Sequence, residues 1–148
     1  MNGLLLRTGS AGAEALESLL RACDAAFVPP LSSRVDINAY ARKIAAHARL
    51  FEAWDGDRLA GLLAMYCNDT TTRTAFVTSV SVLPDHARRG IAGALLRQAI
   101  DAASAAGMRL LALETGAGNA AALALYRKHG FETIDQAGDT LRLALKLS

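Results

Sequence analysis

The stretch from residue 74 to residue 96 constrains the fold of this chain more than any other part of its sequence. Residues 74–83 are rich in β-branched side chains and end at Pro84, a pattern that predicts a strand. After Gly90, apolar residues recur at helical spacing until Gly107, which predicts a helix that ends at this glycine. A strand therefore passes through one short turn directly into a helix.

A second buried strand is predicted at residues 109–115, where an apolar run follows the helix. A strand, a helix and a second strand joined at this length form a right-handed crossover, so strands 74–83 and 109–115 are expected to be parallel. The segments before them differ, because Asp55-Gly56-Asp57 is a tight-turn signal between two alternating apolar runs. We expect strands at 4–8, 49–54 and 58–66 that form an antiparallel meander with 74–83.

Helical periodicity and turn residues predict the remaining elements. We expect a helix after Gly12, a break over residues 27–33 caused by Pro29 and Pro30, a helix over 35–46, a helix from Asn119 to His129 that ends at Gly130, and a hairpin of 131–135 with 140–147.

The composition fits one folded domain that spans residues 1–148. The chain is 52% hydrophobic and 20% charged and has 3 prolines, which excludes disorder by composition. A net charge of +2 is too small to indicate a nucleic-acid or membrane partner, and no apolar run approaches the ~20 residues of a membrane span. Cys23 and Cys67 form no CxxC and have no nearby histidine pair, so we expect reduced thiols, no metal and a cytoplasmic protein.

The turn between strand and helix has the features of an anion site. A helix that opens with small residues exposes its first N–H groups, and its dipole adds about half a positive charge at that end. Arg88 and Arg89 add full charges, while Gly90 and Ala92 let oxygen atoms approach the backbone. The segment is neither a P-loop nor a dinucleotide fingerprint. Taken alone, it is also compatible with an ordinary helix start flanked by two solvated arginines.

Residues 87–92 (Ala-Arg-Arg-Gly-Ile-Ala) and residues 119–131, which run from Asn119 through Tyr126 to Phe131, resemble two motifs of the GNAT family of N-acetyltransferases. Residues 87–92 resemble the cofactor motif Gln/Arg-x-x-Gly-x-Gly/Ala, although Ala87 stands where the family prefers Gln or Arg, so that one side-chain contact is missing. Residues 119–131 resemble the more specific pattern Asn-x-x-Ala-x-x-Leu-Tyr-x-Lys-x-Gly-Phe. The resemblance implies an α/β (α+β) fold with a mixed, largely antiparallel twisted sheet of about six to seven strands, about four helices and a parallel pair that splays apart at an acyl-CoA site.

The resemblance also implies which residues bind acetyl-CoA. Backbone groups of Val80 and Val82 are expected to hold the pantetheine arm, with an N–H near Val82 facing the thioester carbonyl. The other cofactor-binding candidates lie in the two motifs: Ala87, Arg88, Arg89, Gly90, Ile91, Ala92, Gly93, Asn119, Ala122 and Tyr126.

Two residues are candidates for acid–base catalysis. Tyr126 matches the general acid of the family, placed to protonate the leaving sulfur, although a helical tyrosine beside leucine also fits simple packing. The glutamate that histone-modifying members use as a base is replaced here by Phe76. Glu114 is the candidate base, since its surroundings resemble the ribosomal-protein N-terminal acetyltransferases; a strand-end glutamate paired with an arginine is the alternative. Asp85 and His86 are expected to cap or flank the turn.

The acceptor side is the least specific part of the sequence. By analogy with the family, Pro30, Arg34 and Tyr40 form one wall of the acceptor site, and Tyr66 and Asn68 form another. These groups suit a primary amine on a small polar molecule, such as an amino sugar, an amino acid or a polyamine. The enzyme is expected to be an acyl-CoA-dependent N-acyltransferase and a monomer or homodimer. A protein N-terminal acetyltransferase, an acetyltransferase of charged tRNA and a non-catalytic acyl-CoA sensor remain alternatives.

Overall fold

A single mixed sheet runs through the molecule. The computed structural model describes residues 3–27 and 30–147, and its seven strands follow the order β1-β2-β3-β4-β5-β7-β6. The strands are β1 (Leu4–Thr8), β2 (Arg49–Asp55), β3 (Arg58–Tyr66), β4 (Thr74–Val82), β5 (Leu110–Gly116), β6 (Glu132–Ala137) and β7 (Thr140–Lys146). Within the described ranges the helices are α1 (Ala13–Cys23), α2 (Ile37–His47), α3 (Ile91–Ala105) and α4 (Ala120–Lys128), with 3₁₀ turns η1 (Asp24–Ala26), η2 (Leu31–Ser33) and η3 (Pro84–His86).

The topology confirms the main expectations from the sequence. Strands β1 to β4 form the antiparallel meander, and β4 and β5 form the parallel pair on either side of α3. Helix α2 begins two residues later than predicted, because the Asp36 side chain caps it by accepting from the N–H groups of Asn38 and Ala39. Pro29, part of the predicted break, lies outside the described residues.

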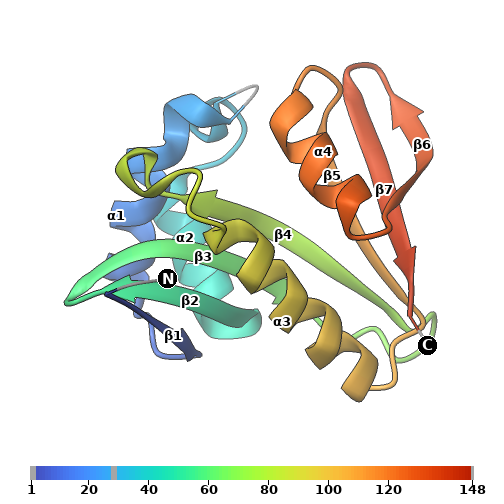
Figure 1. Cartoon of the computed structure of the whole chain (residues 1–148), viewed down its shortest axis with the longest axis horizontal. Coiled ribbons are helices and arrows are strands. Elements are labelled where there is room, and N and C mark those ends of the chain that lie inside the picture. Colours follow the sequence, from blue (N-terminus) through green and yellow to red (C-terminus); the bar gives the residue numbers. More distant parts are fainter. Residues whose placement is uncertain (1–2, 28–29, 148) are drawn as a thin grey trace.

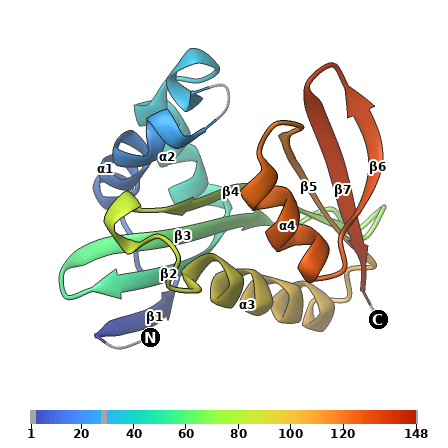
Figure 2. The same cartoon turned by 45° about the horizontal axis from the view of Figure 1, so that its top comes forward.

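Two hydrophobic cores lie on opposite faces of the sheet. One core is formed by α3, α4 and the strand residues that face them, and it includes Leu95, Leu111 and Tyr126. The other lies under α1 and α2 and includes Leu16, Ile44 and Leu62. Figures 1 and 2 show α3 crossing one face of the sheet while α1 and α2 cover the other, with α4 beside the β5–β7 half. No helix in the described part of the chain is long and apolar enough to cross a bilayer.

The final hairpin inserts in an order that the sequence did not predict. Strand β7 pairs antiparallel with β5, so β6 becomes one edge of the sheet, opposite the edge formed by β1. The pairing of β6 skips Ile134, since Thr133 faces Leu143 and Asp135 faces Arg142. Ile134 thus lies in a bulge of the edge strand and is 58% exposed.

Gly61 lets the start of α3 approach the sheet closely. A Cβ atom on this glycine would lie 2.6 Å from Cγ2 of Ile91, the first residue of α3, whose side chain is buried. Neither atom can yield easily, because Ile91 is β-branched and enclosed. This contact therefore fixes the height of the α3 N-terminus above β3.

We expect the substitution Gly61→Ala to lower the free energy of unfolding by about 1–3 kcal/mol through overpacking against Ile91. Urea unfolding measures this change. The matched control is Gly12→Ala, because Gly12 has a negative φ of −81° and no neighbour that a Cβ would meet. Equal stability of the two variants would show that the α3 contact is not tight.

Candidate active site

The parallel strands β4 and β5 pair along only part of their length. Their register runs from Thr74 opposite Leu110 to Val77 opposite Leu113 and then stops. Beyond this point β4 continues on β3 as far as Val82, and β5 continues on β7 as far as Gly116. The ribbons of β4 and β5 lie together at one end and diverge toward the other (Figure 1). The predicted splayed pair is therefore present.

A bulge in β4 coincides with this separation. Ala64 of β3 faces Ser79 and the next residue, Met65, faces Val77, so Thr78 is the extra residue. The hydroxyl of Tyr40 donates to the Thr78 carbonyl at 2.9 Å and lies 2.7 Å from Thr78 Oγ1. Helix α2 thereby stabilises the bulge at the point where the two strands part.

Backbone groups of Val80 and Val82 point toward the separated side of β4. The N–H of Leu83 points toward β3, since it donates to the Ala60 carbonyl of that strand at 2.8 Å. Backbone groups of successive residues in a strand point to alternate sides, so the N–H and C=O groups of Val80 and Val82 face away from β3. The Val82 carbonyl already accepts a hydrogen bond from Cys23 Sγ at 3.4 Å. The Val82 N–H and the N–H and C=O of Val80 are left as candidates to bind a cofactor. Their contact with a cofactor stays a prediction.

The turn before α3 offers unpaired donors. Gly90 is the N-cap of α3 with φ +77°, and no side chain in residues 3–27 or 30–147 caps the helix. The first helical bond runs from Ala94 N–H to the Gly90 carbonyl at 3.0 Å, so the preceding N–H groups of Ile91, Ala92 and Gly93 are left for an external acceptor. The side chain of Ile91 itself is buried in the core.

The residues just before Gly90 are exposed and carry the charge of the turn. Ala87, Arg88 and Arg89 are exposed. Arg88 has φ +64°, a left-handed conformation that is uncommon outside glycine and often marks a functional segment. Two guanidinium groups thus flank a row of free N–H donors, an arrangement suited to phosphate oxygens.

Helix α4 places a buried tyrosine in the core on the α3 side of the sheet. Asn119 caps the helix, since its Oδ1 accepts from Ala122 N–H at 3.2 Å, and Ala122 packs against the core. Tyr126 is 7% exposed and packs on Phe131. Burial raises the pKa of Tyr126 to about 12, so its hydroxyl keeps its proton at neutral pH. This hydroxyl has no hydrogen-bond partner among the described residues.

Glu114 is the first residue of β5 beyond the last pair with β4. It is exposed, and it lies on the opposite face of the sheet from Leu113, which is buried under α3 and α4. Arg142 of β7 stands directly across from it, yet no ion pair joins the two in the described part of the chain. The structure of the described residues therefore does not contain the alternative arrangement, in which Glu114 is a strand-end glutamate in an ion pair with an arginine. Glu114 and Tyr126 therefore lie on opposite faces of the sheet.

Three of the five predicted acceptor-side residues gather near the bulge. Burial raises the pKa of Tyr40, and charge interactions with Tyr66 and Arg34 also act on it, so these side chains are close together. The Tyr66 hydroxyl is enclosed and has no hydrogen-bond partner among the residues described. Pro30, before η2, and Asn68, after β3, are exposed.

Comparison with known proteins agrees with this geometry. The family model described as "Acetyltransferase (GNAT) family" matches residues 13–131. The chain belongs to the GNAT family. It is 34% identical over 91 residues to the uncharacterized N-acetyltransferase YedL of Escherichia coli K12, covering 60% of this chain and 56% of that protein.

Two further similarities concern proteins with more specific descriptions. The [ribosomal protein bS18]-alanine N-acetyltransferase of Escherichia coli K12 is 37% identical over 84 residues, covering 50% of this chain and 57% of that protein. This chain thus spans little more than half the length of these curated relatives. A solved structure described as yncA from Salmonella typhimurium with its cofactor acetyl-CoA has a TM-score of 0.78 at 19% identity, covering 99% of this chain and 95% of that one. At that identity the likeness concerns the fold alone.

In this GNAT chain, a buried histidine anchors the segment before the anion turn. His86 is 5% exposed and bridges Asp55 of β2 at 2.9 Å and Asp85 at 2.8 Å, and Arg58 of β3 pairs with Asp85 at 3.0 Å. Hydrogen bonds to Asp55 and Asp85 raise the pKa of His86. The sequence indicated only that Asp85 and His86 cap or flank the turn. Their tie to the distant β2–β3 hairpin depends on the folded register and carries no local signal.

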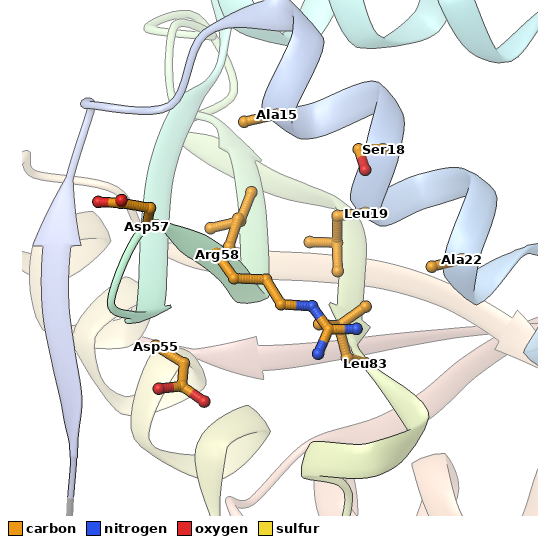
Figure 3. Close-up of a pocket in the computed structure, with 9 residues that line it drawn as sticks. Ala15, Ser18, Leu19, Ala22, Asp55, Asp57, Arg58 and Leu83 are labelled. Carbon is orange, nitrogen blue, oxygen red and sulfur yellow. The ribbon is translucent and has the colours of Figure 1, made fainter.

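A pocket of about 440 Å³ lies beside this anchor, between α1 and the β2–β3 hairpin. Figure 3 shows the Arg58 side chain extending across it toward Leu83. Its lining includes Asp55 but none of the predicted cofactor, catalytic or acceptor residues. Because Arg58 and Asp55 are already engaged with Asp85 and His86, we interpret this region as an anchor of the turn.

We expect the His86 ion pairs to stabilise the protein at mildly acidic pH and to lose this effect at alkaline pH. The pKa of His86 is raised in the folded state, so its contribution is complete below the ordinary value of about 6.5 and disappears as pH rises through the folded-state pKa. Measured by urea unfolding, the stability difference between wild type and His86→Gln should be larger at pH 6 than at pH 9.

The control is His47→Gln, because His47 is exposed at the end of α2 and should give a much smaller pH-dependent change. A wild-type advantage over His86→Gln that grows with pH would contradict the assignment.

Proposed function

We propose that this protein is an N-acetyltransferase that moves an acetyl group from acetyl-CoA to the primary amine of a small polar acceptor, such as an amino sugar, an amino acid or a polyamine. The observation that carries the proposal is the parting of β4 and β5 after Val77, with an uncapped helix start at the end of β4. A solved protein of the same fold contains acetyl-CoA, which supports this choice of acyl donor.

The residues of the turn fit a pyrophosphate. The N–H groups at the start of α3 lack acceptors, Arg88 and Arg89 are exposed, and the space around Gly90 is open, since a Cβ there would meet nothing within 4 Å. Ala87 provides no polar side chain, so the turn binds through backbone donors and the two arginines. The free backbone groups of Val80 and Val82 would hold the extended arm of the cofactor.

Acetyl-CoA supplies an acyl group activated as a thioester, which an amine attacks directly. An amine with a lysine-like pKa of about 10.4 costs about 4.6 kcal/mol to deprotonate at pH 7, so a proton acceptor assists. Glu114 suits this role because it is exposed and unpaired beside the gap. Tyr126 keeps its proton at neutral pH, which suits a donor to the departing sulfur.

The acceptor end favours a small molecule. Arg34, Tyr40 and Tyr66 offer polar groups close to the bulge at Thr78, and Pro30 and Asn68 would complete the walls by analogy with the family. The principal alternative is a protein N-terminus, supported by the 37% identity to a ribosomal-protein alanine acetyltransferase. A non-catalytic acyl-CoA sensor is the second alternative.

The double substitution Arg88→Gln/Arg89→Gln should weaken binding of coenzyme A by roughly ten- to hundredfold, since it removes two charge-assisted contacts to phosphate. Calorimetric titration measures this change, and the loss should shrink as salt is added. The control Arg97→Gln/Arg109→Gln removes the same charge from exposed positions away from the turn and should leave affinity unchanged. Equal losses in both double variants would point to a general charge effect.

The proposed function is tested by a panel of amines in an assay of thiol release from acetyl-CoA. We expect turnover with at least one small polar amine and a decrease in kcat of about a hundredfold or more in Glu114→Ala, because general-base catalysis contributes on this scale. Turnover only with a peptide that has a free N-terminus would favour the protein-directed alternative.

Tyr126→Phe distinguishes an enzyme from a sensor. In an enzyme this variant should lose about a hundredfold in kcat while its affinity for coenzyme A changes little. A wild-type protein that binds coenzyme A but turns over no amine or peptide would instead be a sensor.

A further inference from the structure

Arg142 places an unneutralised guanidinium at the point where β4 and β5 part. Its Cζ lies 5.7 Å from the ring centre of Phe76, so the side chain crosses from β7 over β5 to β4. Phe76 precedes Val77, the last β4 residue that pairs with β5. The guanidinium therefore lies beside the gap between β4 and β5, although Arg142 belongs to β7, which is separated from β4 by β5.

The guanidinium forms no ion pair within the described residues. Glu114 and Asp135 stand opposite Arg142 on the two neighbouring strands, but neither carboxylate lies within salt-bridge distance of it. The Asp135 carboxylate accepts the N–H of Gln136 at 2.8 Å instead. The guanidinium lies over the Phe76 ring, and its N–H groups can still donate to a carboxylate in a bidentate manner.

Glu114 and Arg142 share one face of the sheet. Residues paired directly across two antiparallel strands project to the same side, with Cβ atoms about 4.5–5.5 Å apart. This is the face away from α3 and α4, where Phe76 and its cross-strand partner Tyr66 also lie. The face thus presents one carboxylate and one guanidinium where the pairing of β4 with β5 ends, and neither of them forms an ion pair within the described residues.

We propose that Arg142 determines acceptor specificity by binding the carboxylate of a free amino acid whose amine lies at Glu114. This inference rests on the proposed function and narrows its substrate class. An amino acid carries an amine and a carboxylate a few ångströms apart, so a single molecule can meet a carboxylate and a guanidinium that project from directly paired positions. A polyamine would place a second cation against Arg142, and a peptide N-terminus has an amide where the amino acid has its carboxylate.

The experiment compares each common amino acid with its own carboxamide in two measurements. The first is thiol release from acetyl-CoA. The second is calorimetric binding to the protein saturated with coenzyme A, where no acyl transfer occurs. In the wild type, at least one amino acid should be preferred to its carboxamide by roughly ten- to hundredfold in kcat/KM and in affinity, because a bidentate charge-assisted pair is lost with the amide.

In Arg142→Gln this preference should fall to about one, mainly through KM, while coenzyme A affinity and melting temperature stay unchanged. The preference of Arg142→Lys should lie between those of the wild type and Arg142→Gln, since lysine keeps the positive charge but cannot donate two parallel hydrogen bonds to a carboxylate. The matched control is Lys146→Gln, because Lys146 is an exposed cation on the same strand and face, and this variant should keep the preference.

The binding arm separates this inference from the proposed function. Selective binding of an amino acid without thiol release supports the role of Arg142 and refutes acyl transfer. The inference is overturned if the wild type binds carboxamides or N-terminal peptides as well as amino acids, if it binds none of them, or if Arg142→Gln keeps the preference.

Discussion

The interrupted pairing of β4 with β5 is the constraint on which the rest of this structure depends. A sheet gives up backbone hydrogen bonds where two neighbouring strands separate, and unpaired backbone groups are costly unless they find other partners. Both strands keep their outer neighbours, β3 and β7, so each loses bonds on one side only. Tyr40 satisfies the carbonyl of the bulged Thr78, and Cys23 that of Val82. The groups that remain are those for which we propose a cofactor.

The neighbourhood of the gap is held rigidly from several directions. Gly61 lets Ile91 pack onto β3, which sets the position of the α3 N-terminus, and His86 ties the segment before it to Asp55. These contacts join the first half of the meander to the anion turn. Because donors at a helix start come from the backbone, the donors of the turn remain in place although Ala87 offers no polar side chain. Such a site depends on the conformation of the main chain rather than on one particular side chain.

Much of the fold could be predicted from the sequence because its signals are local. The turn at Asp55-Gly56, the strand end at Pro84 and the Asn119 cap each act within a few residues, and each lies where expected. The position of β7 between β5 and β6, the bulge at Thr78 and the pairing of His86 with Asp55 could not be predicted, since each depends on contacts between distant segments. The proposed roles of Tyr126 and Glu114 come from a resemblance to the family, and the structure adds that Tyr126 is buried and that Glu114 has no ionic partner among the described residues.

The bulge at Ile134 has a consequence for how this molecule behaves among its own copies. Strand β6 offers its free edge to solvent, and a flat edge of this kind can template the addition of strands from other molecules. Skipping Ile134 breaks the regular row of donors and acceptors, and Asp135 adds a charge directly beside the break. The same irregularity that leaves an isoleucine exposed thus discourages edge-to-edge aggregation at this side of the sheet.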